Sequence, residues 1–220
     1  MSNVERYLGA VVREVEHREH EGKPARVVVA MRDYDTTVDD LWDALTNPER
    51  LPRWFLPVSG DLKLGGRYQF KGNAGGTVTR CEPPKHLAVT WEFGGGVSWV
   101  DVILAEAPGG GARLRLEHLA HVNPHWDDYG PGAVGVGWEL ALVKGLDTHL
   151  ASGGAAVDSA AVEAWTMSEE GKAFSAASSE GWAQADVAAG EDAAVAKARA
   201  ARTTAFYTGA PPPDVKHPGT

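Results

Sequence analysis

The densest group of side chains that could carry out chemistry in this sequence consists of histidines and aspartates. It comprises His118, His121 and His125, followed by Asp127 and Asp128. Imidazole and carboxylate groups are common zinc ligands, and an imidazole can also move a proton near neutral pH. If a strand continues to His121, its odd spacing from His118 places the two side chains on opposite faces. We therefore expect no metal site and no catalytic residue here. His118 is expected to face inward, either as a satisfied core histidine or as a group that orients a ligand.

A glycine pattern, G-x-G-x-x-G, covers residues 130–135. In dinucleotide-binding proteins this pattern follows a buried parallel strand, and an acidic residue ends the next strand. Here a polar loop precedes the pattern and a long helical stretch follows it, so we predict no bound cofactor. The glycines are expected to shape the loop and to let the helix approach the sheet closely.

The remaining charged groups offer little chemistry. The neighbouring carboxylates at residues 39–40 and 169–170 fit the first turns of helices, where the helix dipole favours acids. Arg32, Arg53 and Arg67 could each contact an acidic ligand group, but we expect all three to be solvated at the surface.

The elements that must position these groups can be read from the spacing of the apolar residues. Alternation before residue 33 predicts a β-hairpin with a polar turn. Thr36 or Thr37 is a suitable N-cap for an amphipathic helix, and a second short helix is expected over residues 49–55. Short alternating segments and glycine-rich turns fill residues 58–121, which predicts an antiparallel meander.

After this meander the apolar period lengthens to that of a helix. Five large side chains recur at every fourth position: Val134, Trp138, Leu142, Leu146 and Leu150. We predict one α-helix of about five turns with a single broad apolar stripe. The expected fold class is α+β, with a curved antiparallel sheet wrapped around this long helix.

The chain divides into three parts. Residues 1–154 are expected to form the sheet-and-helix domain, including the N-terminal hairpin strand. Residues 155–210 are rich in alanine and serine, with N-cap candidates at Asp158 and Ser168. They have too few large apolar side chains for a core of their own, so we expect a helical annex packed on the domain. Residues 211–220 are expected to be a disordered tail.

Composition narrows the classes of partner. The 220 residues carry a formal net charge of -9 at pH 7 and one cysteine, Cys81. An acidic chain without a run of lysine and arginine argues against nucleic acid and against membranes as partners. One cysteine allows no internal disulfide, and we see neither a secretory signal nor an apolar stretch of membrane-spanning length. We therefore expect a cytoplasmic protein.

Five short motifs between residues 25 and 152 follow one another in a recognisable order. They are Thr46-Asn47-Pro48-Glu49-Arg50-Leu51 with Arg53-Trp54-Phe55, Gly65-Gly66-Arg67-Tyr68, Cys81-Glu82-Pro83-Pro84-Lys85-His86-Leu87 with Trp91-Glu92-Phe93, Arg113-Leu114-Arg115-Leu116-Glu117-His118, and Gly137-Trp138. This series resembles proteins similar to the activator of Hsp90 ATPase. The resemblance implies the helix-grip fold of the START/Bet v 1-like (SRPBCC) superfamily. The additions at both ends resemble those of actinobacterial homologues.

The resemblance implies an internal cavity for a hydrophobic or aromatic small molecule. The leading hypothesis is a binding protein for carriage, sequestration or self-resistance, linked to polyketide or enediyne natural products. One alternative is an enzyme of the cyclase or hydratase type that uses His118 or Tyr68 in the same cavity. A second alternative is an Hsp90 co-chaperone-like interaction protein. A homodimer is compatible with each of these hypotheses.

Alternation along the strands and the stripes of the helices select the side chains that would line such a cavity. The expected ligand-binding residues are Trp54, Phe55, Tyr68, Phe70, Val89, Trp91, Val102, Leu116, His118, Trp138 and Leu142. For any one of them, packing in a solid core is the simpler interpretation. For the group, the resemblance favours a cavity.

Overall fold

The structure is a computed structural model in which residues 7–213 are described. Most of the tail predicted at residues 211–220 lies outside the described residues, which end at residue 213. Among the helices of the described range, none is both long and apolar enough to cross a membrane.

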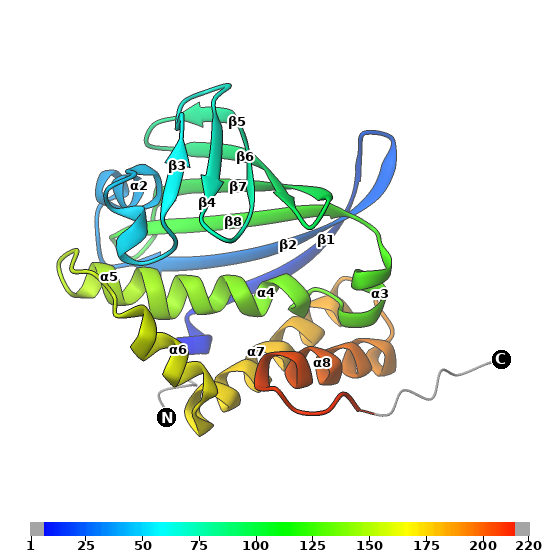
Figure 1. The fold of residues 1–220 in the computed structure, drawn as a ribbon. Helices are drawn as coiled ribbons and strands as arrows, with labels where there is room; N and C mark the ends of the chain where they lie inside the picture. Colours follow the sequence, from blue (N-terminus) through cyan, green and yellow to red (C-terminus); the bar gives the residue numbers. More distant parts are fainter. Residues whose placement is uncertain (1–6, 214–220) are drawn as a thin grey trace.

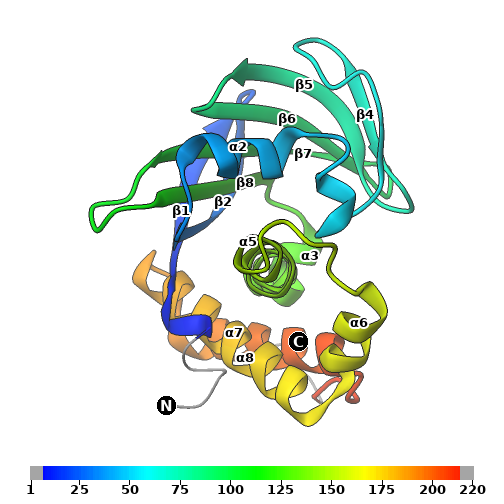
Figure 2. The same ribbon diagram turned by 90° about the vertical axis from the view of Figure 1, so that its left-hand side faces the viewer.

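One antiparallel sheet of eight strands forms the framework of the fold (Figure 1). The strands lie in the order β1-β2-β8-β7-β6-β5-β4-β3, so the N-terminal hairpin joins the meander through β8. The strands are β1 (Val11–His20), β2 (Lys23–Tyr34), β3 (Val58–Gly60), β4 (Arg67–Phe70), β5 (Gly75–Glu82), β6 (His86–Phe93), β7 (Gly96–Glu106) and β8 (Ala112–His121). The sheet curves around the long helix, which is seen end-on in Figure 2. The predicted helix-grip fold is therefore confirmed.

The N-terminal hairpin places two arginines on the inner face of the sheet. β1 and β2 pair in a register that sets Val11 opposite Arg32 and Arg13 opposite Ala30. Arg32 was expected at the surface, but only 8% of it is exposed. Its guanidinium instead donates to the Asp147 carboxylate at 2.8 Å, which supplies the counter-charge that a buried arginine needs. The hairpin thus places arginine guanidinium groups on the side of the sheet that faces the long helix.

The segment after the hairpin begins with the expected helix, α2 (Val38–Thr46), which is capped by the Thr37 hydroxyl. The second helix, predicted over residues 49–55, is wrong in length. Only a 3₁₀ turn forms there, η1 (Leu51–Arg53), and it contains Pro52. Because Pro52 has no backbone N–H, one hydrogen bond of an α-helical ladder is missing within this segment.

The long helix runs unbroken through three parts: α4 (Gly132–Glu139), η2 (Leu140–Asp147) and α5 (Thr148–Ala151). Its central part, η2, is a π-helix, so the prediction of one regular α-helix is wrong. Apolar residues at every fourth position would drift by about 40° per step around an α-helix. The wider turns of a π-helix, with i→i+5 hydrogen bonds, rotate the stripe back. The four-residue spacing is therefore better matched by a mixture of the two helix types.

Three further helices cover the other side of the long helix. They are α6 (Ser159–Met167), α7 (Glu169–Ala188) and α8 (Ala193–Thr208). Asp158 caps α6 and Ser168 caps α7, at the positions expected from the sequence. α7 contacts both β1 and α4, and α8 packs on α7. The long helix therefore lies between the curved sheet and these helices (Figure 2).

Glycines of the motif at residues 130–135 bring the long helix close to its neighbours in this C-terminal part. A Cβ atom on Gly135 would overlap the Trp182 ring of α7, and one on Gly132 would press against Thr203 of α8. We expected these glycines to let the long helix approach the sheet, and this prediction is wrong: Gly132 and Gly135 face α8 and α7 instead. The first glycine of the motif does shape the loop, since its φ is 61°.

Candidate functional site

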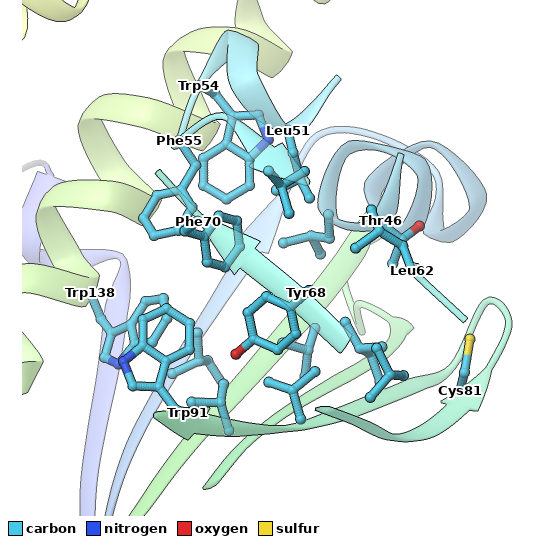
Figure 3. A pocket seen from close by; sticks show the side chains of 18 of the residues that line it. Thr46, Leu51, Trp54, Phe55, Leu62, Tyr68, Phe70, Cys81, Trp91 and Trp138 are labelled. Atoms are coloured by element: carbon cyan, nitrogen blue, oxygen red, sulfur yellow. The ribbon is translucent and has the colours of Figure 1, made fainter. Parts of the chain in front are cut away.

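A cavity lies between the inner face of the sheet, the long helix and the segment that connects α2 to β4 (Figure 3). Its strand residues are Val58, Tyr68, Phe70, Val78, Cys81, Leu87, Val89, Trp91, Val100, Val102 and Leu116. Its helix and loop residues are Leu45, Thr46, Leu51, Trp54, Phe55, Leu62, Trp138 and Leu142. None of these lining side chains is an aspartate, glutamate, lysine, arginine or histidine.

The cavity is partly open to solvent. Its volume is about 120 Å³. An apolar cavity of roughly 150 Å³ is enough to bind benzene. The cavity volume is somewhat smaller than this, so any ligand larger than a single aromatic ring would extend to the mouth.

Four aromatic side chains close the end of the cavity next to the long helix. Their ring centroids are 5.1 Å apart for Phe55 and Phe70, 5.8 Å for Phe70 and Trp91, 5.2 Å for Trp91 and Trp138, and 6.3 Å for Trp138 and Phe55. These contacts form a closed circuit, which we call the aromatic circuit. Cys81 lies at the opposite end (Figure 3). The cavity therefore has an aromatic end and an end lined mainly by aliphatic side chains.

Two polar side-chain groups of the lining already have partners within the protein. The Trp54 indole N–H donates to the carbonyl oxygen of Ala44 at 2.8 Å. The Tyr68 hydroxyl donates to the carbonyl oxygen of Thr90 at 2.7 Å. Burial raises the pKa of Tyr68, so this hydroxyl stays protonated at neutral pH. Neither group needs a ligand to complete its hydrogen bonding.

His118 lies behind the cavity wall and holds Trp138 in place. Its Nδ1 atom accepts the Trp138 indole N–H at 3.0 Å, so Nδ1 carries no proton. Nε2 therefore carries the hydrogen and faces the Ser98 hydroxyl oxygen at 2.8 Å, while Ser98 donates to the Trp91 carbonyl oxygen at 3.2 Å. Burial lowers the pKa of His118 to about 4, so the imidazole is neutral at pH 7.

Ten of the eleven predicted site residues line this cavity. They are Trp54, Phe55, Tyr68, Phe70, Val89, Trp91, Val102, Leu116, Trp138 and Leu142. The eleventh, His118, does not line the cavity but contacts two residues of its wall, Trp138 and Trp91. The inward orientation predicted for His118 is observed, and 7% of the residue is exposed.

Sequence reasoning missed nine lining residues: Leu45, Thr46, Leu51, Val58, Leu62, Val78, Cys81, Leu87 and Val100. Leu87 and Val100 belong to the same alternating sets as Val89 and Val102, so the strand pattern contained their signal. Leu62 lies in a loop, where spacing carries no information about direction. Only the folded chain could place that residue.

The histidine cluster does not converge on one point. The Nε2 atom of His121 lies 3.0 Å from the carbonyl oxygen of His20, and its ring is 5.1 Å from that of Trp99. His118 lies on the opposite face, as the odd spacing predicts, and His125 is exposed on α3 (Pro124–Tyr129). Across residues 7–213, no group of three or more His, Cys, Asp or Glu side chains could hold a metal ion.

Comparison with known proteins connects this geometry to a family. The model for "Activator of Hsp90 ATPase homolog 1-like protein" matches residues 35–151. The crystal structure of CalU16 from Micromonospora echinospora is 34% identical, with a TM-score of 0.65 over 80% of this chain and 98% of that chain. The solution structure of CalU16 is 32% identical, with a TM-score of 0.67 over 82% of this chain and 97% of that chain.

A more distant structure shares the fold alone. DynU16, described as a protein in the dynemicin biosynthetic locus, is 24% identical, with a TM-score of 0.51 over 60% of this chain and 49% of that chain. Comparison with curated proteins found no match.

Proposed function

The chain belongs to the Activator of Hsp90 ATPase homolog 1-like family, and from this premise we propose that its cavity binds an uncharged, aromatic hydrophobic small molecule. The observation that carries the proposal is the wall of the cavity, which contains no charged side chain. An ionised ligand group would lose its hydration there without gaining a partner, at a cost of several kcal/mol. Aromatic rings at one end favour a ligand with a ring system of its own.

A binding role is better supported than an enzymatic one. The cyclase or hydratase alternative needs a group that can exchange a proton with the ligand. The two candidates for that group were His118 and Tyr68. Both nitrogens of His118 are occupied by Trp138 and Ser98, and the Tyr68 hydroxyl donates to a backbone carbonyl. We therefore propose a protein that holds its ligand without transforming it.

The proposed biological role is carriage, sequestration or self-resistance toward a natural product. The position of DynU16 in the dynemicin biosynthetic locus supports this choice of ligand source. At 24% identity DynU16 shares only the fold, so the ligand chemistry rests on the cavity itself. The co-chaperone alternative rests on the family's name and has no structural observation in its favour.

The proposal can be tested with two fluorescent probes that differ in charge. N-phenyl-1-naphthylamine is neutral, whereas 8-anilino-1-naphthalenesulfonate carries a similar ring system and a sulfonate. We expect saturable binding of the neutral probe, with a dissociation constant at least about 100-fold lower than that of the anion, because an unpaired charge costs several kcal/mol on burial. Equal affinities, or no binding of the neutral probe, would contradict the proposal.

A matched pair of valine substitutions locates the binding site. Val89 lines the cavity, whereas Val97 lies on the neighbouring strand and is 52% exposed. Val89→Trp fills the cavity and should abolish binding of the neutral probe. Val97→Trp adds the same indole outside the cavity and should leave the affinity unchanged. If both variants bind like the wild type, the probe binds elsewhere.

A further inference from the structure

The π-helical stretch η2 is tied to the sheet at both of its ends. Glu139, which precedes η2, accepts two hydrogen bonds from the Arg13 guanidinium of β1, at 2.6 and 3.0 Å. Asp147, the last residue of η2, accepts one from Arg32 of β2 at 2.8 Å. Two neighbouring strands thus each supply one arginine to one boundary of the same irregular helical segment.

Glu139 is the more completely enclosed of these two acids. Its exposed fraction is 0%, and Ser178 of α7 also donates to its carboxylate at 2.8 Å. Burial raises the pKa of Glu139, while Arg13 and Ser178 act in the opposite direction. A buried ion pair adds little net stability compared with packed apolar side chains, although breaking it is costly. The main effect of this pair is therefore expected to be geometric.

The cavity wall depends on the register of the helix that Glu139 holds. Trp138, the preceding residue, belongs to the aromatic circuit, and Leu142 within η2 also lines the cavity. The carbonyl oxygen of Leu142 accepts a hydrogen bond from the Tyr34 hydroxyl at 3.3 Å. If η2 rewound as an α-helix, its two flanks would rotate against each other by on the order of 100°, the turn of one α-helical residue. The α4 part, which carries Trp138, would then turn relative to the α5 part, so Glu139 and Asp147 could not both keep their arginine partners.

We propose that Glu139 is a positioning residue: paired with Arg13, it holds η2 in its π-helical register and thereby keeps Trp138 in the cavity wall. This inference rests on the proposed function, because the wall in question encloses the proposed ligand site. In this arrangement β1 and α7 both help to close the aromatic end of the cavity. β1 does so through Arg13, and α7 does so through Ser178.

The first test follows Trp138 itself. In Glu139→Gln the side chain keeps its size and loses its charge. The reporter is the indole ¹H–¹⁵N signal of Trp138, identified by its disappearance in Trp138→Phe. Because this N–H is bonded to His118, we expect its signal to shift and its hydrogen exchange to become at least tenfold faster in Glu139→Gln.

The matched control is Asp186→Asn. Asp186 is another buried carboxylate that pairs with an arginine, Arg199, at 3.4 Å, but this pair lies between α7 and α8. A general loss of stability should occur in both variants, whereas the Trp138 signal should change only in Glu139→Gln. An unchanged signal in folded Glu139→Gln would overturn the proposal, and so would an equal change in Asp186→Asn.

The second test measures release of N-phenyl-1-naphthylamine by stopped-flow fluorescence. We expect at least tenfold faster release from Glu139→Gln and a wild-type rate from Asp186→Asn. If Glu139→Gln does not fold, the double variant Arg13→Met/Glu139→Leu replaces the ion pair with apolar side chains, and the same two changes are expected. Wild-type release rates in a folded variant would overturn the proposal. If the wild type does not bind the probe, the proposed function fails, and the Trp138 signal still decides the positioning role.

Discussion

Lowering the pH should destabilise the folded protein through His118, because its imidazole is buried with no charged partner. Burial lowers the His118 pKa from 6.5 to about 4. Between these two values the unfolded chain takes up a proton that the folded protein does not. The stability that neutral His118 contributes is therefore fully present above pH 6.5 and is lost as the pH falls toward 4.

The magnitude follows from the separation of the two pKa values. At about 1.4 kcal/mol per pH unit, the His118 shift corresponds to roughly 3 kcal/mol. About 2 kcal/mol of this should already be lost between pH 7 and pH 5, before most carboxylates protonate. Such a loss is a large fraction of the stability of an ordinary domain.

Urea unfolding at pH 7, 6 and 5 measures this loss. The comparison is with His118→Asn, whose amide oxygen can still accept the Trp138 indole N–H but cannot take up a proton. We expect this variant to be less stable than the wild type at pH 7 and to lose about 2 kcal/mol less between pH 7 and pH 5. If the two proteins show the same dependence on pH, His118 is not held neutral by burial and the reasoning about its tautomer fails.

Three further outcomes are expected. Gly135→Ala should lower the free energy of unfolding by about 1–3 kcal/mol, measured by urea unfolding, because its Cβ would overlap the Trp182 ring. Tyr68→Phe should leave probe affinity within about threefold of the wild type, since its hydroxyl is already bonded to backbone; a loss of binding in a fluorescence titration would show that the hydroxyl serves the ligand. A hydrogen bond from Arg50 lowers the pKa of Asp40 in the folded protein. The stability that this pair contributes is therefore present above the pKa that Asp40 has in the unfolded chain, and it is lost as the pH falls through the lower pKa of the folded protein. Arg50→Met should therefore flatten the loss of stability on acidification below about pH 4, measured by thermal unfolding.

The sheet and most of the cavity wall could be predicted from the sequence, because a strand with one buried face repeats its apolar side chains at every second position. Tyr68 and Phe70 on β4, like Val89 and Trp91 on β6, follow this rule and lie in the wall. The helix caps were equally predictable, because they depend on local contacts. Asp158, for example, accepts hydrogen bonds from the N–H groups of the next turn.

What sequence reasoning missed depends on partners that are distant along the chain. Arg32 looks like a surface residue until Asp147 is placed beside it, 115 positions later. Glu139 reads as the polar side of an amphipathic helix, whereas Arg13 and Ser178 enclose it. The π-helical stretch was missed for the same reason. Spacing shows that apolar residues repeat, but only the surrounding contacts decide how tightly the helix winds to align them.

The distance between these partners along the chain has a consequence for the order in which the protein can be made. Arg13 and Glu139 are separated by 126 positions, and the Ser178 hydroxyl that completes the site comes 39 positions after Glu139. A chain emerging from the ribosome can pair β1 with β2 early, yet the carboxylate of Glu139 lacks its last donor until α7 has been synthesised. Closure of loops this long is slow compared with local folding. The sheet should therefore form while the chain is still growing, and the cavity should take its final shape only after the C-terminal helices have been released.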